Sequence, residues 1–100
     1  MIRHIIQQGA QRDVRDAAQW YASQSKSAAA NFVADYEKGV KVIRAFPFLS
    51  PVFEGTTRKH NLSRFPFGVV YEVEPNLLKV IAVIDLRRKP GYWKSRNKVK

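Results

Sequence analysis

The period of the apolar residues changes from helical to alternating at two prolines, Pro47 and Pro51. Ahead of the prolines, two sets of apolar residues recur three or four positions apart, which puts each set on one face of a helix. The two sets are Val14, Ala17, Ala18 and Tyr21, and then Ala29, Phe32, Val33, Tyr36, Val40 and Ile43. Proline lacks an amide hydrogen and disfavours helix in the residue before it, so the second helix must end near Pro47. The pattern therefore predicts an antiparallel helical hairpin from about Asp13 to Ala45.

A short polar stretch separates the two helical sets. The first helix should end near Ser23 to Ser25, and either Ser25 or Ser27 can begin the second by accepting a hydrogen bond from a free amide. Three consecutive alanines at positions 28–30 favour helix. The connection between the helices should therefore be very short.

Beyond the prolines the apolar residues alternate, as they do in strands. The predicted strands are Arg58 to Leu62, Phe65 to Val73 and Leu77 to Asp85, and isoleucines predict an opening strand within Ile2 to Gln7. Glu74-Pro75-Asn76 suits a turn. The last strand is apolar on nearly both faces, so we expect it at the centre of the sheet.

Alternation also assigns side chains to the two faces of this sheet. Val69, Tyr71 and Val73 should share one face, with Val70 and Glu72 on the other, and Leu78, Val80, Ala82 and Ile84 should form one row on the last strand. The aromatic residues Phe32, Tyr36, Phe65, Phe67 and Tyr71 fall at core-facing positions. That placement favours a core over a binding stripe.

The order of these elements predicts an α+β fold. An N-terminal strand and an antiparallel helical hairpin should precede a three-stranded antiparallel sheet and a basic C-terminal tail, with the hairpin on one face of the sheet. One hundred residues suffice for one domain, so we expect residues 1–100 to share one core. From about residue 94 the tail should be flexible.

The formal charge of +10 is concentrated in the second half of the chain. Residues 1–57 carry seven Lys/Arg and five Asp/Glu, whereas residues 58–100 carry eleven and three. Such asymmetry indicates an acidic partner, such as nucleic acid, an anionic membrane or an acidic protein, or else a solvated face with a basic tail.

Composition excludes several classes of site. The chain has no cysteine, which rules out a disulfide framework, a thiolate nucleophile and a cysteine zinc site. Its two histidines, His4 and His60, are far apart in sequence, so we expect no metal and no cofactor. No segment reaches the roughly 20 apolar residues of a membrane span, and we expect no membrane partner and a cytoplasmic location.

Two segments in the second half of the chain carry distinctive runs of residues. They are the run from Arg58 to Val73, with its Phe-Pro-Phe at 65–67 and Val-Val-Tyr at 69–71, and the run Val80 to Ile84 followed by Arg87-Arg88-Lys89-Pro90-Gly91-Tyr92-Trp93. In order and spacing these residues resemble the RelE/ParE superfamily of type II toxin–antitoxin systems, and most closely its ParE branch. The resemblance implies the same fold over nearly the whole chain.

Two positions depart from the patterns of that superfamily. Asp85 stands where many ParE-like toxins have histidine, and Gly68 stands where the RNA-cleaving RelE branch usually has arginine. Both departures remove a cation from the expected active face. Glycine cannot hold a phosphate by charge, so Gly68 disfavours mRNA cleavage.

A ribonuclease would need a base, an acid and cations around the phosphate. The candidate catalytic residues for that chemistry are Arg58, His60, Arg64, Arg87 and Tyr92. Neighbouring cations such as Arg58 and Lys59 should lower the pKa of His60 and suit it to act as a base. The alternative is an exposed histidine on an edge strand.

Target binding without catalysis would use the basic end of the chain. The candidate residues are Arg87, Arg88, Lys89, Tyr92, Trp93 and Arg96. Arg87 and Arg88 follow a buried strand, and alternation would point them in opposite directions, so that one of them is structural. Asp85 can pair with Arg87 or Lys89, and Tyr92 and Trp93 can either stack on a partner or anchor the tail.

Three functions remain open. The first is a ParE-like toxin, for which the resemblance implies inhibition of DNA gyrase and neutralisation by a cognate antitoxin that we expect to be acidic. The second is a RelE-like endoribonuclease acting on mRNA at the ribosome, and the third is a basic nucleic-acid-binding module without toxicity. The Phe-Pro-Phe run and the closing Arg-Arg-Lys-Pro-Gly-Tyr-Trp favour the first.

Overall fold

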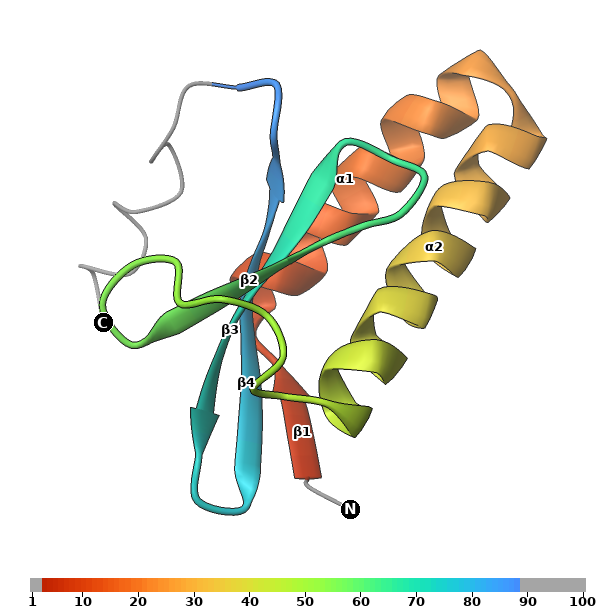
Figure 1. Ribbon diagram of the computed structural model, residues 1–100. Coiled ribbons are helices and arrows are strands. Elements are labelled where there is room, and N and C mark those ends of the chain that lie inside the picture. Colours follow the sequence, from red (N-terminus) through yellow and green to blue (C-terminus); the bar gives the residue numbers. More distant parts are fainter. Residues whose placement is uncertain (1–2, 89–100) are drawn as a thin grey trace.

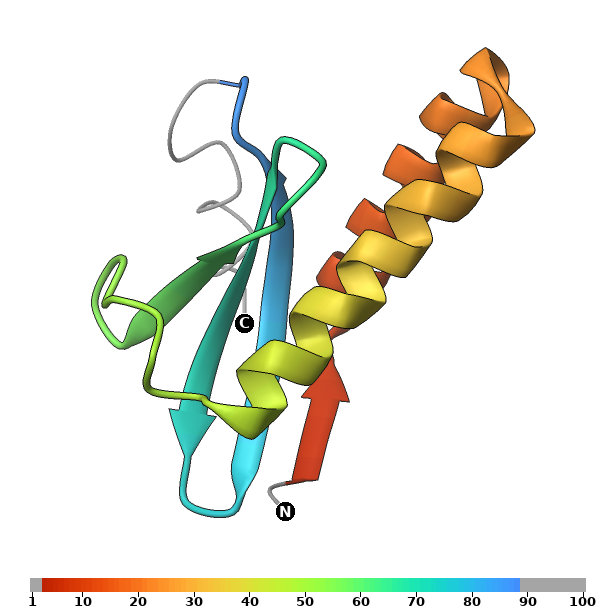
Figure 2. The ribbon, with the colours of Figure 1, turned by 45° about the vertical axis from the view of Figure 1, so that its right-hand side comes forward.

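In the computed structural model, which describes residues 3–88, a helical hairpin lies against one face of a four-stranded sheet (Figure 1). The elements are β1 (Arg3–Ile6), α1 (Gln8–Gln24), α2 (Lys26–Ala45), β2 (Thr57–Asn61), β3 (Phe67–Glu74) and β4 (Leu77–Asp85). Figure 2 shows both helices on the same side of the sheet. The α+β fold expected from the sequence is confirmed, although several strand boundaries differ by one or two residues and α1 begins earlier than expected.

The sheet has the order β1-β4-β3-β2, which makes β4 a central strand as predicted. β4 pairs antiparallel with β3, and β3 pairs antiparallel with β2. β1 lies parallel to β4, and the chain between them forms the helical hairpin, β2 and β3. Asn76 occupies the tight turn between β3 and β4 with a positive φ of 63°, a conformation that asparagine tolerates.

The first helix begins earlier than the hydrophobic pattern indicated. α1 starts at Gln8 rather than near Asp13, and its first turn buries Ala10 completely. The pattern missed this turn because its only core residue is a small alanine. At the other end, Ser25 closes α1 and begins α2, where its hydroxyl accepts a hydrogen bond from the Ala28 amide at 2.9 Å. α2 ends at Ala45, just before Pro47, as predicted.

The main core lies between the helices and the sheet. Tyr21 of α1 and Phe32 of α2 stack with ring centroids 5.4 Å apart, and Phe65 and Phe67 pack edge-on around them. Phe32, Tyr36, Phe67 and Tyr71 are all buried in this core, and Phe65 packs against it. The expectation that these aromatic residues form core is confirmed.

The row predicted on the last strand is wrong, because β4 contains a bulge at Ile81. Val80 pairs with Tyr71 and Ala82 pairs with Val70, which leaves Ile81 without a partner on β3. Leu78, Val80 and Val83 consequently face the helices, whereas Ile81, Ala82 and Ile84 join Val70 on the opposite face. An extra residue in one strand reverses the alternation beyond it.

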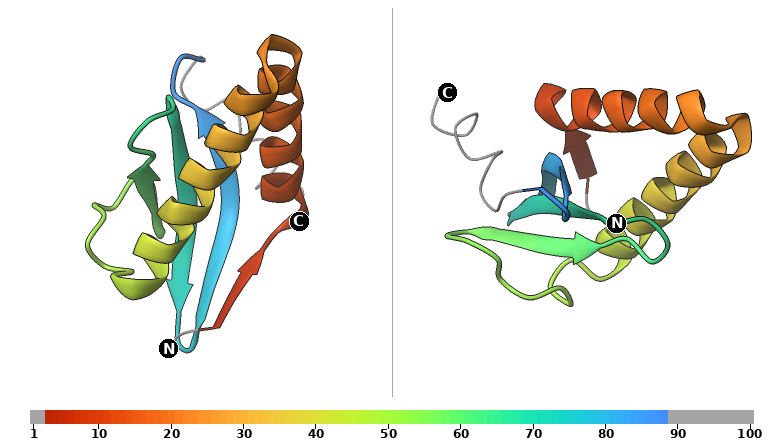
Figure 3. Two further views of the ribbon diagram at one scale, coloured as in Figure 1. Left: turned by 90° about the vertical axis from the view of Figure 1, so that its right-hand side faces the viewer. Right: turned by 90° about the horizontal axis from the view of Figure 1, so that it is seen from above.

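The opposite face of the sheet has its own small apolar cluster. Val70, Ile81, Ala82 and Ile84 are buried there, and Phe53 from the segment between α2 and β2 packs against them. Figure 3 shows this segment passing beside β2, away from α1. Within residues 3–88, no helix is long and apolar enough to cross a membrane.

Candidate functional site

An arginine is fixed in place where the central strand ends. β4 ends at Asp85 and the chain then turns, so that the Arg87 side chain reaches the Asp85 carboxylate at the end of the strand. Its Nε lies 3.0 Å from Oδ1 of Asp85 and its Nη2 lies 3.1 Å from Oδ2, a two-pronged ion pair. The guanidinium carbon also lies 6.0 Å from the centre of the Phe67 ring. The predicted pairing of Asp85 with Arg87 is confirmed.

This pair changes the acidity of both groups. The hydrogen bonds from Arg87 hold the pKa of Asp85 below its usual value, although partial burial opposes them. The Asp85 carboxylate in turn raises the pKa of Arg87, with a smaller contribution from Tyr21. Both side chains therefore stay charged at neutral pH, and Asp85 restrains the guanidinium in one orientation.

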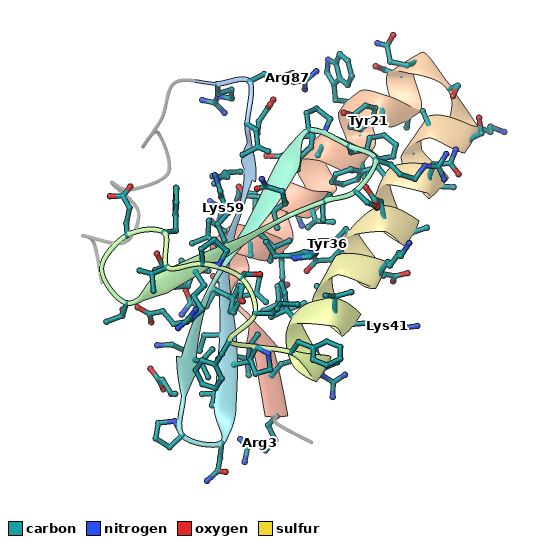
Figure 4. All side chains as sticks on the ribbon, in the orientation of Figure 1. Arg3, Tyr21, Tyr36, Lys41, Lys59 and Arg87 are labelled. Atoms are coloured by element: carbon teal, nitrogen blue, oxygen red, sulfur yellow. The ribbon has the colours of Figure 1, made fainter. Side chains whose placement is uncertain are left out.

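A hollow of about 360 Å³ lies between this pair and α1. Its lining residues are Asp13, Asp16, Ala17, Trp20, Tyr21, Phe67, Val83, Asp85, Arg87 and Arg88. Figure 4 shows Arg87 and Tyr21 at the same end of the molecule. Trp20 is 52% exposed at the rim, so a flat apolar surface lies beside two guanidinium groups.

Carboxylates outnumber guanidinium groups among the described residues of the hollow. Asp13, Asp16 and Asp85 line it with Arg87 and Arg88, so from these residues alone a phosphodiester would meet net negative charge. Asp13 is also engaged, because its Oδ2 accepts a hydrogen bond from the Val83 amide at 2.9 Å. The arrangement suits binding to a protein surface that offers carboxylates to the arginines and apolar groups to Trp20.

The expectation that Arg87 and Arg88 point opposite ways rests on strand alternation. Both line the same hollow. Strand alternation does not apply to them, because β4 has already ended and residues 86–88 form a turn in which the Arg88 amide donates to the Asp85 carbonyl at 3.1 Å.

His60 lies elsewhere, on the edge strand β2. It is half-buried against α2, where a Cβ placed on Gly39 would come within 3.4 Å of its ring. Burial lowers the pKa of His60, and the Asp35 carboxylate opposes that shift. The direction agrees with the sequence-based expectation, but the cause is burial rather than neighbouring cations. His60 lines two hollows beside β2, and Arg87 lines neither of them.

The other two basic candidates have structural contacts. Arg58 donates hydrogen bonds through Nη1 to the Ser50 carbonyl at 2.6 Å and to the Phe48 carbonyl at 3.3 Å. Arg64 is exposed, and its backbone amide donates to Asp35. The structure therefore does not gather Arg58, His60 and Arg64 around Arg87. The remaining candidates, Lys89, Tyr92, Trp93 and Arg96, lie outside the described residues.

Sequence reasoning missed Asp35, a buried carboxylate on α2. Its oxygens accept hydrogen bonds from the Ser63 hydroxyl at 2.9 Å and from the amides of Arg64 and Phe65 at 2.9 and 3.1 Å. The signal was present, since Asp35 lies on the same helical face as Phe32. It fixes the segment before β3 and is a structural residue. In the described part of the chain, no group of three metal-binding side chains is found.

Comparison with known proteins gives a match in structure but not in sequence. No family model and no curated protein matches the chain. Nine chains of solved structures match it. One of them, from a structure described as the "Chromosomal ParDE TA system from P. aeruginosa", is 18% identical, with a TM-score of 0.77 over 86% of this chain and 97% of that one. The chain thus has the fold of a component of a ParDE toxin–antitoxin system, as its sequence resemblance implied.

Proposed function

We propose that this chain is the toxin of a type II toxin–antitoxin pair, that it inhibits DNA gyrase in the manner of the ParE branch, and that an acidic antitoxin neutralises it. The observation that carries the proposal is the fold shared with a component of a ParDE system over 86% of the chain. The residues at 65–71 and 87–93 that resemble the ParE branch support the same assignment.

The chemistry of the hollow supports inhibition by binding rather than by catalysis. Arg87 and Arg88 stand among carboxylates, and His60, the only histidine among the ribonuclease candidates, lies on the other side of the sheet's centre, on β2. A gyrase surface with acidic and apolar groups would match Arg87, Arg88 and Trp20.

The surroundings of Gly68 disfavour the RelE-like ribonuclease alternative. A Cβ at this position would come within 3.0 Å of the Lys59 side chain and of Asn61 Oδ1, so an arginine there would have to displace both. The side chains of Lys59 and Asn61, on β2, therefore crowd the position where the RelE branch usually has arginine. A non-toxic basic module remains the alternative from a different class, since +10 charge alone attracts nucleic acid.

One experiment separates the three functions. The chain is induced in bacterial cells, and plasmid supercoiling, transcript integrity and growth are followed together, with and without the adjacent reading frame. We expect growth arrest and loss of gyrase supercoiling with intact transcripts, both reversed by the neighbouring frame. Cleaved transcripts with normal supercoiling would indicate the ribonuclease, and unaffected growth would indicate the basic module. Gyrase and the antitoxin are cytoplasmic partners, so the proposal assigns the chain to the cytoplasm.

A further inference from the structure

The segment that joins α2 to β2 exposes several large apolar side chains. Phe46, Phe48, Leu49 and Val52 are 61%, 66%, 75% and 61% exposed. They account for four of the seven large apolar residues exposed in the described part of the chain, within a run of seven positions. We call residues 46–52 the apolar loop. Apolar side chains gathered in this way mark an interaction surface more often than isolated ones do.

The apolar loop is held in one conformation. The Tyr71 hydroxyl, from the buried core, donates to the Pro47 carbonyl at 2.8 Å. Arg58 of β2 donates to the Ser50 carbonyl at 2.6 Å, and its guanidinium carbon lies 5.3 Å from the centre of the Phe48 ring. A loop fixed by side chains of the sheet loses little entropy on binding, so its apolar groups are available for a partner at low cost.

The sequence on either side of the apolar loop is rich in positive charge. From Lys38 to Asn61 the chain carries five Lys/Arg and one Glu. A hollow of about 230 Å³ lies between the loop and β2, with Ser50, Val52 and Phe53 on one side and Lys59, His60 and Asn61 on the other. The Lys59 Nζ sits 4.5 Å from the centre of the Phe53 ring, next to the hollow. A partner that fits this surface needs apolar side chains with acidic ones close by.

We infer that the apolar loop and the adjacent hollow are a docking surface for an acidic segment of the antitoxin, one that carries apolar side chains between its carboxylates. This inference rests on the proposed function. Two other occupants fit less well. A second copy would bring another +10 chain against the same cations. A nucleic acid could stack bases on Phe46 and Phe48 but would leave the exposed aliphatic side chains of Leu49 and Val52 without apolar partners. The hollow beside the apolar loop shares no lining residue with the hollow beside Arg87.

The test uses the full chain and the acidic protein encoded by the adjacent reading frame as the probe. Leu49→Glu and Phe48→Ser alter the apolar loop, and Ile5→Glu is the matched control, because Ile5 is an exposed apolar residue on β1. We expect the dissociation constant to rise about 30-fold or more for the two loop variants, the scale of an interface hot spot, and less than about 3-fold for the control. Thermal unfolding of each variant shows whether it is folded.

Hydrogen exchange gives a second readout that needs no variant. The amides of residues 46–52 and 59–61 should become protected when the wild-type complex forms. Tight binding with unchanged affinity in both loop variants, and no protection there, would overturn this inference but leave the proposed function standing. No binding by the wild-type chain would overturn both. A wild-type dimer that Leu49→Glu dissociates would assign the surface to a second copy instead.

Discussion

The carboxylate of Asp13, on α1, accepts a hydrogen bond from the backbone amide of Val83, on β4, at 2.9 Å. β1 pairs with β4 only as far as Ile6 and Val80, and beyond that point α1 covers this edge of β4. A helix cannot continue the ladder of strand hydrogen bonds, so a side chain supplies the acceptor that a strand would have provided. This bond ties α1 to the strand that ends at the candidate site.

Replacement of Asp13 by alanine should destabilise the fold. Val83 is buried, and its amide would lose its acceptor, which costs about 1–3 kcal/mol in the free energy of unfolding. Asp13→Asn retains a side-chain oxygen and should lose less. Asp16→Ala, at an exposed position of the same helix, is the control and should stay within about 0.5 kcal/mol. Urea unfolding measures all three, and equal losses for Asp13→Ala and Asp16→Ala would contradict the assigned role.

Asp35 should make the free energy of unfolding fall at acidic pH. Burial raises the pKa of this carboxyl, but the hydrogen bonds from Arg64, Ser63 and Phe65 outweigh burial and hold the pKa below its usual value. A lowered folded-state pKa gives stability that is complete above the unfolded value of about 4 and is lost as the pH falls through the folded value. Asp35→Asn should therefore be less stable than wild type at pH 7, by about 2 kcal/mol.

The difference between wild type and Asp35→Asn should shrink as the pH falls below about 4. Asp85 has a lowered pKa as well, but it is present in both proteins and cancels in the comparison. Chemical unfolding at several pH values between about 2 and 7 gives this difference directly. A gap that stays constant across that range would show that Asp35 is not the titrating group.

The basic pair after β4 should carry toxicity. Arg87→Ala and Arg88→Ala should each relieve growth inhibition and weaken gyrase inhibition while leaving thermal unfolding nearly unchanged, because both side chains are exposed. Arg87→Lys should be as weakly toxic as Arg87→Ala, since lysine cannot reproduce the two-pronged contact with Asp85. Arg15→Ala, an exposed arginine on α1, is the matched control. If the variants and the control are equally toxic at equal expression, Arg87 and Arg88 are not part of the site.

Removing the hydroxyl of Tyr36 should not weaken the fold. This oxygen is buried and has no hydrogen-bond partner among residues 3–88, and burial raises the pKa of Tyr36 to about 12. Tyr36→Phe removes an unsatisfied polar group from the core and keeps the ring. The free energy of unfolding should therefore be unchanged or higher by about 1 kcal/mol. Tyr71→Phe is the contrasting variant and should lose about 1 kcal/mol, because the Tyr71 hydroxyl donates to Pro47. Calorimetric unfolding of both proteins measures the difference, and a clear loss in Tyr36→Phe would mean that its hydroxyl has a partner.

Gly39 should resist enlargement. A Cβ at this position would lie 2.9 Å from Cδ2 of Leu62, which is buried, and 3.4 Å from the His60 ring. Gly39→Val should therefore push β2 away from α2 and cost about 1–3 kcal/mol. Ala34→Val, at an exposed position of the same helix, should cost only the small difference in helix propensity, about 0.5 kcal/mol. Similar stabilities for the two variants would show that α2 and β2 are not in close contact.

The sequence alone determined the elements and their order. Periodicity is a local property, so helical spacing before Pro47 predicted the hairpin, and alternating spacing after it predicted β4. The bounds of β4 are those observed, Leu77–Asp85. The same local rules predicted the aromatic core and a serine cap on α2, and the structure selects Ser25 over Ser27. The Asp85–Arg87 pair was foreseen as well, because two residues of opposite charge lie close together after a strand.

Which residues meet at the candidate site depends on how the elements pack together. The bulge at Ile81 turns Val83 toward the helices, and the turn after Asp85 brings both arginines to one hollow. Neither feature has a local signal, because a bulge depends on how β4 pairs with β3 and β1 at once. Asp13 and Asp35 likewise gain their roles from backbone amides about 70 and 30 residues away. Such partners are set by the packing of whole elements, which the sequence around each residue does not encode.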